Sequence, residues 1–364
     1  MKKGCFGIYM YPTWRHACFA SFHYPRALRI YSFSVRHIIN FVCYIKNFLY
    51  YCSRRNKSQL FLLNTQKYTM ENVIVGLGEI LWDVFPHGKV LGGAPANFVY
   101  HVSQFGYEGY AVSAIGNDHL GDEIIESLKN KELNFLIERT PFPTGTVKVK
   151  IDENGAPQYE ICEDVAWDNI PFTEEMEQLA RRTRTVCFGS LAQRHPASRA
   201  TINAFLDFVS PDALIIFDIN LRQHFYSMEL IDESLSRCNI LKINDEELAT
   251  VAELFEWESA TELEVCKQLL ENYSLNMVVL TRGANGSYVI TPTGTSFKKT
   301  PGIVVADTVG AGDSFTAAFV AALLNGKSIN DAHKLAVEVS AFVCTQHGAM
   351  PLLPDSLLSM INQQ

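Results

Sequence analysis

The sequence lacks several features that would assign it quickly to a class of protein. Its best apolar run in the first 69 residues, Ile38 to Ile45, is too short to span a bilayer, and the order of segments that marks a secretory signal is missing. Its nine cysteines form no Cys-x-x-Cys pair and no Cys/His spacing typical of zinc. We therefore expect a cytoplasmic protein with reduced, mostly buried thiols and no structural zinc site.

Acidic residues are missing from the first 69 positions. Residues 1–69 hold eleven of the 31 Lys and Arg residues and none of the 39 Asp and Glu residues, so the remaining chain carries 20 basic and 39 acidic side chains. Such an acidic body argues against a nucleic-acid-binding protein. Two interpretations of residues 1–69 stay open: a targeting or membrane-surface arm, or an atypical extension, disordered or outside the native protein, that ends before Met70.

Neither common nucleotide-binding fingerprint is complete. Gly76 and Gly78 begin a dinucleotide-binding turn, but Leu81 stands at its third glycine position. Gly326 precedes Lys-Ser as in a P-loop, but Ala321 replaces the first glycine. A nicotinamide-dependent oxidoreductase is therefore an alternative that lacks part of its own motif.

From Glu71 onward, short apolar runs rich in β-branched residues alternate with amphipathic helical patterns. Strands are expected at 73–78, 110–115, 185–191, 213–219, 240–243, 277–281 and 287–291. Helices are expected at 93–105, 120–131, 174–184, 197–209, 245–255, 262–272, 312–324 and 329–345. This alternation predicts an α/β fold in layers around a mostly parallel sheet, formed by residues 70–364.

Two stretches, at about 79–91 and 144–168, interrupt the alternation with strand and turn patterns. Val147, Val149 and Ile151 recur with the period of two that is typical of an antiparallel strand with one exposed face. We expect both stretches to pair into a small sheet, either a lid or a structural flap. Its exposed edge could pair with a second copy, so a homodimer is a further expectation.

The segment DTVGAGDSF, Asp307 to Phe315, places a carboxylate on each side of a glycine turn that opens a helix. Free N–H groups at a helix mouth, together with flexible glycines, make a site for phosphate or for developing negative charge. Asp313 is then a candidate base for an attacking hydroxyl, and Asp307 a residue that holds the loop or a cation. A capped helix with Asp313 in its first turn is the alternative.

A second glycine turn, LGGAPANF from Leu91 to Phe98, opens another helix. Gly93 and Asn97 lie one helical turn apart, so the Asn97 amide lies beside the helix mouth. There it can donate to and accept from sugar hydroxyls. A simple N-terminal cap interaction is the alternative.

In order and separation, GGAPAN and DTVGAGDSF resemble the two signatures of the ribokinase-like, PfkB-type carbohydrate kinases, from Asn72 to about Leu353. The resemblance implies a three-layer α/β/α sandwich with a small β-sheet lid, and transfer of the ATP γ-phosphoryl group to a sugar or nucleoside hydroxyl. It assigns catalysis to Asp313 as base with an anion hole of the Gly310, Ala311 and Gly312 amides, and sugar binding to Gly92, Gly93 and Asn97.

Further segments resemble the nucleotide and metal sites of the same family. NDEE resembles its Asn-x-x-Glu, in which Asn244 lies near the nucleotide and Glu247 organises Mg²⁺ through water; a helix N-cap is the alternative. TRGANGS resembles the nucleotide loop, with contacts at Thr281, Gly283 and Gly286 besides Gly310 and Gly312, although a plain hairpin turn explains the same glycines.

Two more resemblances concern charge. Arg222 in DINLR corresponds to a cation near the substrate and the γ-phosphate, or else belongs to a surface salt bridge. Gly348, with Asp307, resembles the family's monovalent-cation loop and implies potassium as a further ion.

Within the family, GEILWDVFP and GKVLGGAPANF are most similar to fructokinases. Asp83 is the expected acceptor for sugar hydroxyls, since one carboxylate can accept two of them; an exposed lid acid is the alternative. We therefore expect an enzyme that uses ATP and Mg²⁺ to convert D-fructose to fructose 6-phosphate. A ribokinase, another ketose or pentose kinase, and a non-catalytic sugar sensor remain alternatives.

Overall fold

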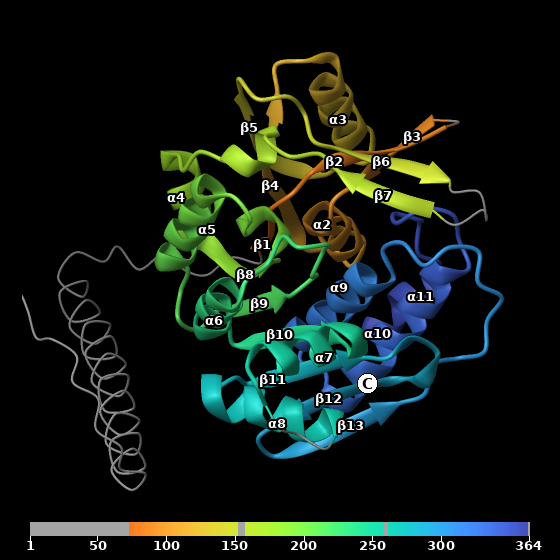
Figure 1. Cartoon of the computed structure of the whole chain (residues 1–364). Coiled ribbons are helices and arrows are strands. Elements are labelled where there is room, and N and C mark those ends of the chain that lie inside the picture. The colour runs from red at the N-terminus through yellow and green to blue at the C-terminus, as the bar shows by residue number, and fades with distance from the viewer. Residues whose placement is uncertain (1–72, 87, 152–156, 258–260, 363–364) are drawn as a thin grey trace, which may run out of the picture. The chain divides into compact units, whose positions relative to one another are not determined.

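The computed structural model describes residues 73–86, 88–151, 157–257 and 261–362 (Figure 1). The predictions made for residues 1–69 lie outside these ranges, so the division of the chain near Met70 stays a prediction. None of the described helices combines the length and the apolar composition that a membrane crossing needs.

The main sheet consists, among the described residues, of nine strands in the order β13-β12-β11-β10-β9-β8-β1-β4-β5. Their bounds are β1 Val73–Leu77, β4 Glu108–Gly116, β5 Asn134–Thr140, β8 Thr183–Phe188, β9 Leu214–Asp218, β10 Ile240–Asn244, β11 Met277–Thr281, β12 Ser287–Thr291 and β13 Gly294–Lys298. In this spatial order, the seven strands β11, β10, β9, β8, β1, β4 and β5 pair in parallel, whereas β12 and β13 form an antiparallel edge. A parallel sheet must be covered on both faces, and helices cover this one.

The helices divide between the two faces of the sheet (Figure 1). One core joins the sheet to α4 Glu174–Arg182, α5 Pro196–Phe208, α6 Met228–Arg237, α7 Asp245–Leu254 and α8 Glu262–Tyr273. The other joins it to α2 Ala94–Gln104, α3 His119–Asn130, α9 Ala311–Leu324 and α10 Ile329–Cys344, with the short α11 Asp355–Leu358 beside them.

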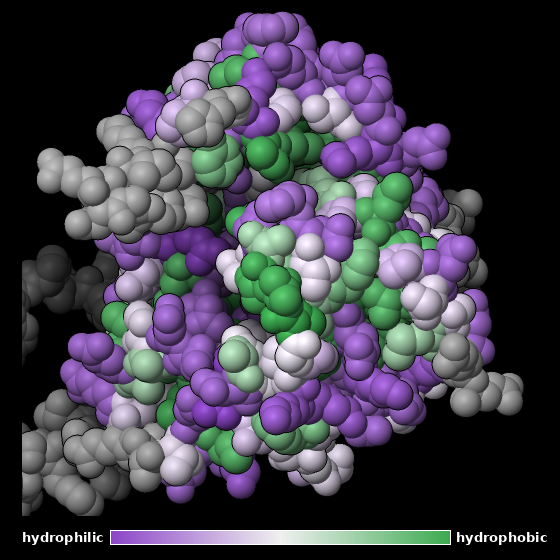
Figure 2. All heavy atoms as spheres, turned by 90° about the vertical axis from the view of Figure 1, so that its right-hand side faces the viewer, coloured by the Kyte–Doolittle hydropathy of each residue, from purple (hydrophilic) through white to green (hydrophobic). Residues whose placement is uncertain are grey.

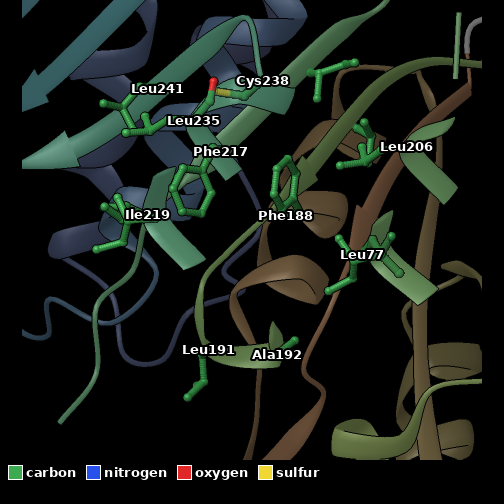
Figure 3. Packing of buried hydrophobic residues seen from close by; sticks show 14 of the residues in the cluster. Leu77, Phe188, Leu191, Ala192, Leu206, Phe217, Ile219, Leu235, Cys238 and Leu241 are labelled. Carbon is green, nitrogen blue, oxygen red and sulfur yellow. The ribbon is translucent and has the colours of Figure 1, made fainter. Parts of the chain in front are cut away.

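Alternation along the strands produces these two cores. On β1, Val73, Val75 and Leu77 belong to the first core, whereas Ile74 belongs to the second. Figure 3 shows part of the first core, where Phe188 of β8 and Phe217 of β9 stack with their ring centroids 5.3 Å apart. The expected three-layer α/β/α sandwich is confirmed.

A second sheet lies apart from the first and has the order β3-β2-β6-β7 (Figure 1). Its strands are β2 Leu81–Phe85, β3 Gly88–Gly92, β6 Thr146–Ile151 and β7 Pro157–Ile161. The two interrupting stretches therefore pair with each other, through the parallel contact of β2 with β6. This sheet is the small β lid of the expected fold class; a homodimer through its edge stays a prediction.

The structure contains elements that periodicity did not predict. Helix α6 is rich in acids and begins at the Ser227 cap, whose side chain accepts from the Leu230 N–H. Strands β5 and β13 are edge strands with few fully buried residues, so their apolar pattern is weak. The helix expected at 174–184 ends at Arg182, because the next residues already belong to β8.

The cysteines of the described region are free thiols. Cys187, Cys238 and Cys266 are buried, and Cys162 and Cys344 are partly buried. Burial raises the pKa of both Cys238 and Cys266 to about 12, so these thiols stay protonated at neutral pH. The expectation of reduced and mostly buried thiols agrees with this arrangement.

A buried ion pair fastens the segment that follows the lid to the main domain. Arg194 donates two hydrogen bonds to Asp168, at 2.7 and 2.8 Å, and a third to the Cys162 carbonyl at 2.6 Å. Its guanidinium also lies 4.1 Å from the ring centroid of Trp167 and 4.5 Å from that of Phe225. Both charged side chains are almost fully buried, so removal of one would leave the charge of the other buried without an ion-pair partner.

We therefore predict that Asp168→Asn lowers the free energy of unfolding by about 3 kcal/mol, as expected when a buried pair loses one charge. Urea denaturation followed by circular dichroism measures this change. The control is Lys148→Ala, which breaks the half-exposed lid pair between Lys148 and Glu160 and is expected to change stability by less than about 1 kcal/mol. Equal changes of the unfolding free energy in both variants would contradict the stabilising role of the buried Arg194–Asp168 pair.

Candidate active site

The candidate residues gather where the parallel strands end. Strands β8, β9, β10 and β11 run in parallel, so their carboxyl ends share one edge of the sheet. Asp218 closes β9 opposite Lys242 of β10, and Asn244 closes β10 opposite Thr281 of β11. Ligands of open α/β sheets bind outside this edge.

The first glycine turn forms the mouth of α9. Gly310 is the N-cap of this helix with φ of 75°, and a Cβ there would lie 2.7 Å from the Ala349 side chain. A glycine is therefore required at this position for both conformation and space. The Ala311 N–H donates to the Thr308 carbonyl at 3.3 Å, whereas the N–H groups of Gly310 and Gly312 find no acceptor within the described ranges. The latter two amides are free to bind an anion.

The second glycine turn forms the mouth of α2. Gly93 is its N-cap with φ of 114°, and a Cβ there would lie 2.4 Å from the Glu79 carbonyl oxygen. Gly92 is the last residue of lid strand β3, and a Cβ on it would lie 2.5 Å from the Asp83 Oδ2 of β2. Asp83 itself is half-buried on β2, and burial raises its pKa to about 6. The structure thus brings together Gly92 and Asp83, two of the expected sugar-binding residues.

A hydrogen bond joins the two helix mouths. The Asn97 Nδ2 of α2 donates to the Asp313 Oδ2 of α9 at 2.8 Å, although the two residues are 216 positions apart. The Asn97 Oδ1 is buried, and no hydrogen-bond partner for it exists in the described structure. Asn97 therefore orients the candidate base and keeps an acceptor available for a ligand.

The environment of Asp313 favours proton transfer near neutral pH. Burial, with a smaller contribution from the charge of Asp218, raises the pKa of Asp313 to about 6. The Asn97 hydrogen bond and the charges of Lys242 and Arg222 act in the opposite direction. A carboxylate with this pKa is ionised at neutral pH but is more basic than an exposed aspartate, as suits a general base.

A buried lysine balances the acids of the site. The Lys242 Nζ lies 3.1 Å from the Asp218 Oδ1, and the Thr316 hydroxyl of α9 donates to the Asp218 Oδ2 at 3.2 Å. Lys242 also lies close beneath the mouth of α9, because a Cβ on Gly312 would be 2.8 Å from its Nζ. The charges of Asp218, Glu247 and Asp313 raise its pKa, so the ammonium stays charged.

Asn244 and Glu247 form the cap of α7. The Asn244 Oδ1 accepts from the Glu247 N–H at 2.8 Å, and the Glu247 Oε2 accepts from the Asn244 N–H at 2.9 Å. The Glu247 Oε1 accepts from the Leu221 N–H at 3.1 Å. The capping interpretation of NDEE therefore holds in this structure. Each carboxylate oxygen retains a second lone pair, which fits a water-bridged Mg²⁺ rather than direct ligation.

The expected nucleotide loop follows β11. Gly283 begins a short 3₁₀ turn, and Gly286, with φ of 93°, ends it; the Arg282 N–H donates to the Gly286 carbonyl at 2.9 Å. This is also the geometry of a hairpin turn into β12, so both interpretations of the glycines remain compatible with the fold. Thr281, the last residue of β11, is partly exposed at the same edge as Asn244.

The expected cation loop and Arg222 are also placed by the structure. The Asp307 Oδ2 accepts from the Gly348 N–H at 3.1 Å and its Oδ1 from the Val309 N–H at 3.0 Å, so Asp307 holds the loop before α9. Arg222 is exposed, and its Nη1 donates to the Leu221 carbonyl at 3.0 Å. Its charge still reaches Asp313 and lowers the pKa of that carboxyl.

Exposed hydrophobic side chains occur in the loop that leads from β13 to α9. Val304 is 89% exposed, and Val305 and Val309 are also exposed. Figure 2 shows one face of the molecule, on which hydrophobic side chains gather in a patch surrounded by hydrophilic ones. The loop before α9 therefore presents apolar surface on the approach to the mouth of this helix.

A sequence model of the pfkB family carbohydrate kinases matches residues 79–356, which include both glycine turns, the lid and the α7 cap. The chain belongs to the pfkB family of carbohydrate kinases. As a member of that family it is a sugar kinase, and its fold is the ribokinase-like fold of its structural neighbours.

Individual relatives of this pfkB-family kinase are distant. A fructokinase of Salmonella typhimurium is 27% identical over 300 residues, which cover 76% of this chain and 95% of the relative. An ATP-dependent 6-phosphofructokinase of Thermoanaerobacterium thermosaccharolyticum is 26% identical over 274 residues, with 73% and 83% coverage. The solved structure of an uncharacterized sugar kinase from Pyrococcus horikoshii in complex with ATP has a TM-score of 0.67 at 25% identity, and the match covers 79% of this chain and 99% of that chain.

Three charged residues of this sugar kinase were missed by the sequence analysis: Glu79, Asp218 and Lys242. Asp218 ends β9, and a polar residue that closes an apolar strand is a usable signal. Lys242 lies opposite it inside β10, where a lysine in an otherwise apolar strand is a second signal. Glu79 directly follows Gly78 of the incomplete glycine motif. For all three residues, burial in the site is what marks them as candidates, and burial of a single charged residue cannot be read from the sequence.

The raised pKa of Asp313 leads to a prediction about stability. A buried acid whose folded pKa exceeds its unfolded pKa destabilises the protein above the folded pKa, and this cost disappears below the unfolded pKa near 3.8. We predict that Asp313→Asn raises the free energy of unfolding at pH 8 by on the order of 1 kcal/mol, since the side chain is partly exposed.

Urea denaturation of wild type and variant measures this difference, at pH 8 and at the lowest pH at which both proteins are still folded. The gain is expected to shrink as the pH falls through about 6, the folded pKa of Asp313. A variant that is less stable than wild type at pH 8 would contradict the electrostatic account.

Proposed function

We propose that this sugar kinase transfers the γ-phosphoryl group of ATP to a primary sugar hydroxyl, and that D-fructose, converted to fructose 6-phosphate, is its substrate. The observation that carries the proposal is the hydrogen bond of Asn97 to Asp313. This bond supports the proposal because it joins Asn97 of the expected sugar turn to Asp313, the expected base, which lies next to the free amides of the α9 mouth. A hydroxyl held at Asn97 would therefore lie within reach of both groups.

In the proposed reaction each protein group has one task. Asp313 accepts the proton of the attacking hydroxyl. The Gly310 and Gly312 amides stabilise the charge that spreads over the phosphoryl oxygens, and the Lys242 ammonium beneath them adds a fixed positive charge. Asp83 and Gly93 hold the sugar from the lid side and the core side of the α2 mouth.

ATP and Mg²⁺ belong to the proposal. The neighbouring sugar kinase from Pyrococcus horikoshii was solved with ATP, which supports ATP as the donor. Asn244 and Glu247 would hold Mg²⁺ through water at the end of β10, and the ion would neutralise charge on the phosphate groups. Potassium at the loop of Asp307 and Gly348 stays a prediction.

The charge of the site supports an uncharged acceptor. Asp83, Asp218 and Asp313 are acids at or near the sugar turn, and repulsion would disfavour an acceptor that already carries phosphate. This favours fructose over fructose 6-phosphate, although relatives named for each kind of acceptor have nearly equal identity to this chain. Ribose and other ketoses remain the nearest alternatives within the family.

The acceptor is tested with an ADP-release assay over fructose, fructose 6-phosphate, ribose, tagatose, 2-keto-3-deoxygluconate and adenosine. We predict the highest kcat/KM for fructose and at least about a tenfold lower value for fructose 6-phosphate, because its phosphate meets the acidic site. A preference for fructose 6-phosphate would refute the assignment of the acceptor. No turnover with any acceptor would refute the proposed function.

The base is tested with Asp313→Asn, which keeps the shape of the side chain. We predict a loss of kcat of ~10²–10⁴-fold, with ATP binding measured by calorimetry largely unchanged. In the wild type, kcat/KM is expected to fall as the pH drops below about 6, because protonated Asp313 cannot accept a proton. A variant with near-normal kcat would rule out the role of Asp313.

A further inference from the structure

Glu79 is a buried acid that the proposed reaction has not used. It lies between core strand β1 and lid strand β2, and only 2% of its surface is exposed. Its Oε2 is buried, and no hydrogen-bond donor for it exists in the described part of the chain. A buried carboxyl oxygen without a partner is costly, so its retention calls for an explanation.

The neighbours of Glu79 are those of the active site. It lines the same cavity as Asp313, Asp218 and Asn220. Burial raises the pKa of Glu79 to about 7, and the nearby charge of Asp313 contributes in the same direction. Its own N–H and that of Ala94, the first residue of α2, act as hydrogen-bond donors and offset part of this shift. The carboxyl therefore lies between the α2 mouth and the candidate base.

The character of the site limits what could pair with Glu79. A phosphate would be repelled by Glu79 and Asp313 together, whereas a hydroxyl donor would satisfy the free oxygen without adding charge. The Asn97 Oδ1 is a second buried acceptor without a partner and is bound through Asn97 to Asp313. Two free acceptors beside one base match a ligand with several hydroxyl groups.

We propose that Glu79 contacts the acceptor sugar, with its Oε2 as hydrogen-bond acceptor for a hydroxyl other than the one that is phosphorylated. This inference rests on the proposed function and adds to it a residue that selects the sugar. The lid residue Asp83 and the core residue Glu79 would then hold different hydroxyls of one polyol.

A purely structural role is the competing explanation, since the amides near α2 already donate to the Glu79 carboxyl. Glu79→Gln separates the two roles. The glutamine carbonyl oxygen can still accept from those amides, whereas its NH₂ group replaces the free acceptor with a donor. A structural residue would therefore tolerate this change better than a sugar-contacting residue.

The experiment compares wild type, Glu79→Gln and the control Glu271→Gln, which removes an exposed charge on α8. At pH 8, where Glu79 with its pKa of about 7 is mostly ionised, we expect Glu79→Gln to raise the KM for the preferred acceptor at least about tenfold, as for loss of a hydrogen bond to a charged group. The KM for ATP is expected to stay near the wild-type value, and the melting temperature is expected to stay the same or rise, because Glu79→Gln removes a buried acid whose pKa is raised. The control is expected to change none of these. Calorimetric titration with D-fructose measures sugar affinity independently of turnover.

Deoxy analogues of fructose identify the hydroxyl. The analogue that lacks the contacted hydroxyl is expected to bind wild type and Glu79→Gln equally, because the interaction is already absent. Unchanged sugar affinity in Glu79→Gln, or equal losses for the sugar and ATP with a lower melting temperature, would overturn the inference. If wild type binds fructose more tightly than the variant but shows no turnover, the proposed function fails while the sugar contact stands; if wild type binds none of the sugars, both fail.

Discussion

The candidate site depends on the hydrogen bond between Asn97 and Asp313, and this bond depends on the whole main domain. The bond forms only because α2, near the start of the domain, and α9, near its end, pack on the same face of the sheet with their N-termini together. The glycines at both mouths allow this approach, since a Cβ on Gly93 or Gly310 would collide with neighbouring atoms. The bond fixes the Asp313 carboxylate toward the sugar turn, and without it a partly buried acid would lose its main donor.

An acid beside an anion-binding helix mouth looks contradictory, because the acid repels the anion. The buried Lys242 resolves this problem. Its ammonium is held by Asp218 and lies beneath Gly312, where it adds to the positive end of α9. A lysine at a helix N-terminus is itself unfavourable without negative partners, so the acids stabilise it, and the phosphoryl group of the proposed reaction would do the same. The site therefore balances its charge only when all of these groups are present.

Much of this arrangement follows from the sequence, but not all of it. Continuous apolar strands and amphipathic helices have strong periods, so the sheet and most helices were predictable, whereas the acid-rich α6 and the edge strands β5 and β13 were not. Glycine turns at helix mouths were also visible, and they led to the prediction of Asn97 and Asp313 as site residues. The buried charges Glu79 and Lys242 were not, because their role depends on neighbours that only the fold brings together.

The NDEE segment shows how a correct motif can still leave two interpretations. Asn244 and Glu247 were predicted either as a helix cap or as a nucleotide contact and a magnesium residue, respectively, and the structure shows the cap. The cap does not compete with the metal, since it fixes the rotamer of Glu247 and leaves a lone pair on each oxygen for water.

Glu79 lies between the residues that recognise the sugar in the proposed function and those that transfer the phosphoryl group. Asp83 belongs to β2 of the lid sheet, whereas Asn97 and Asp313 belong to helices packed on the main sheet. Glu79 lies where the chain passes from one sheet to the other. A sugar that contacts Asp83 and Glu79 would therefore couple the lid to the core, and the base would keep its orientation through Asn97 whether or not the lid has closed.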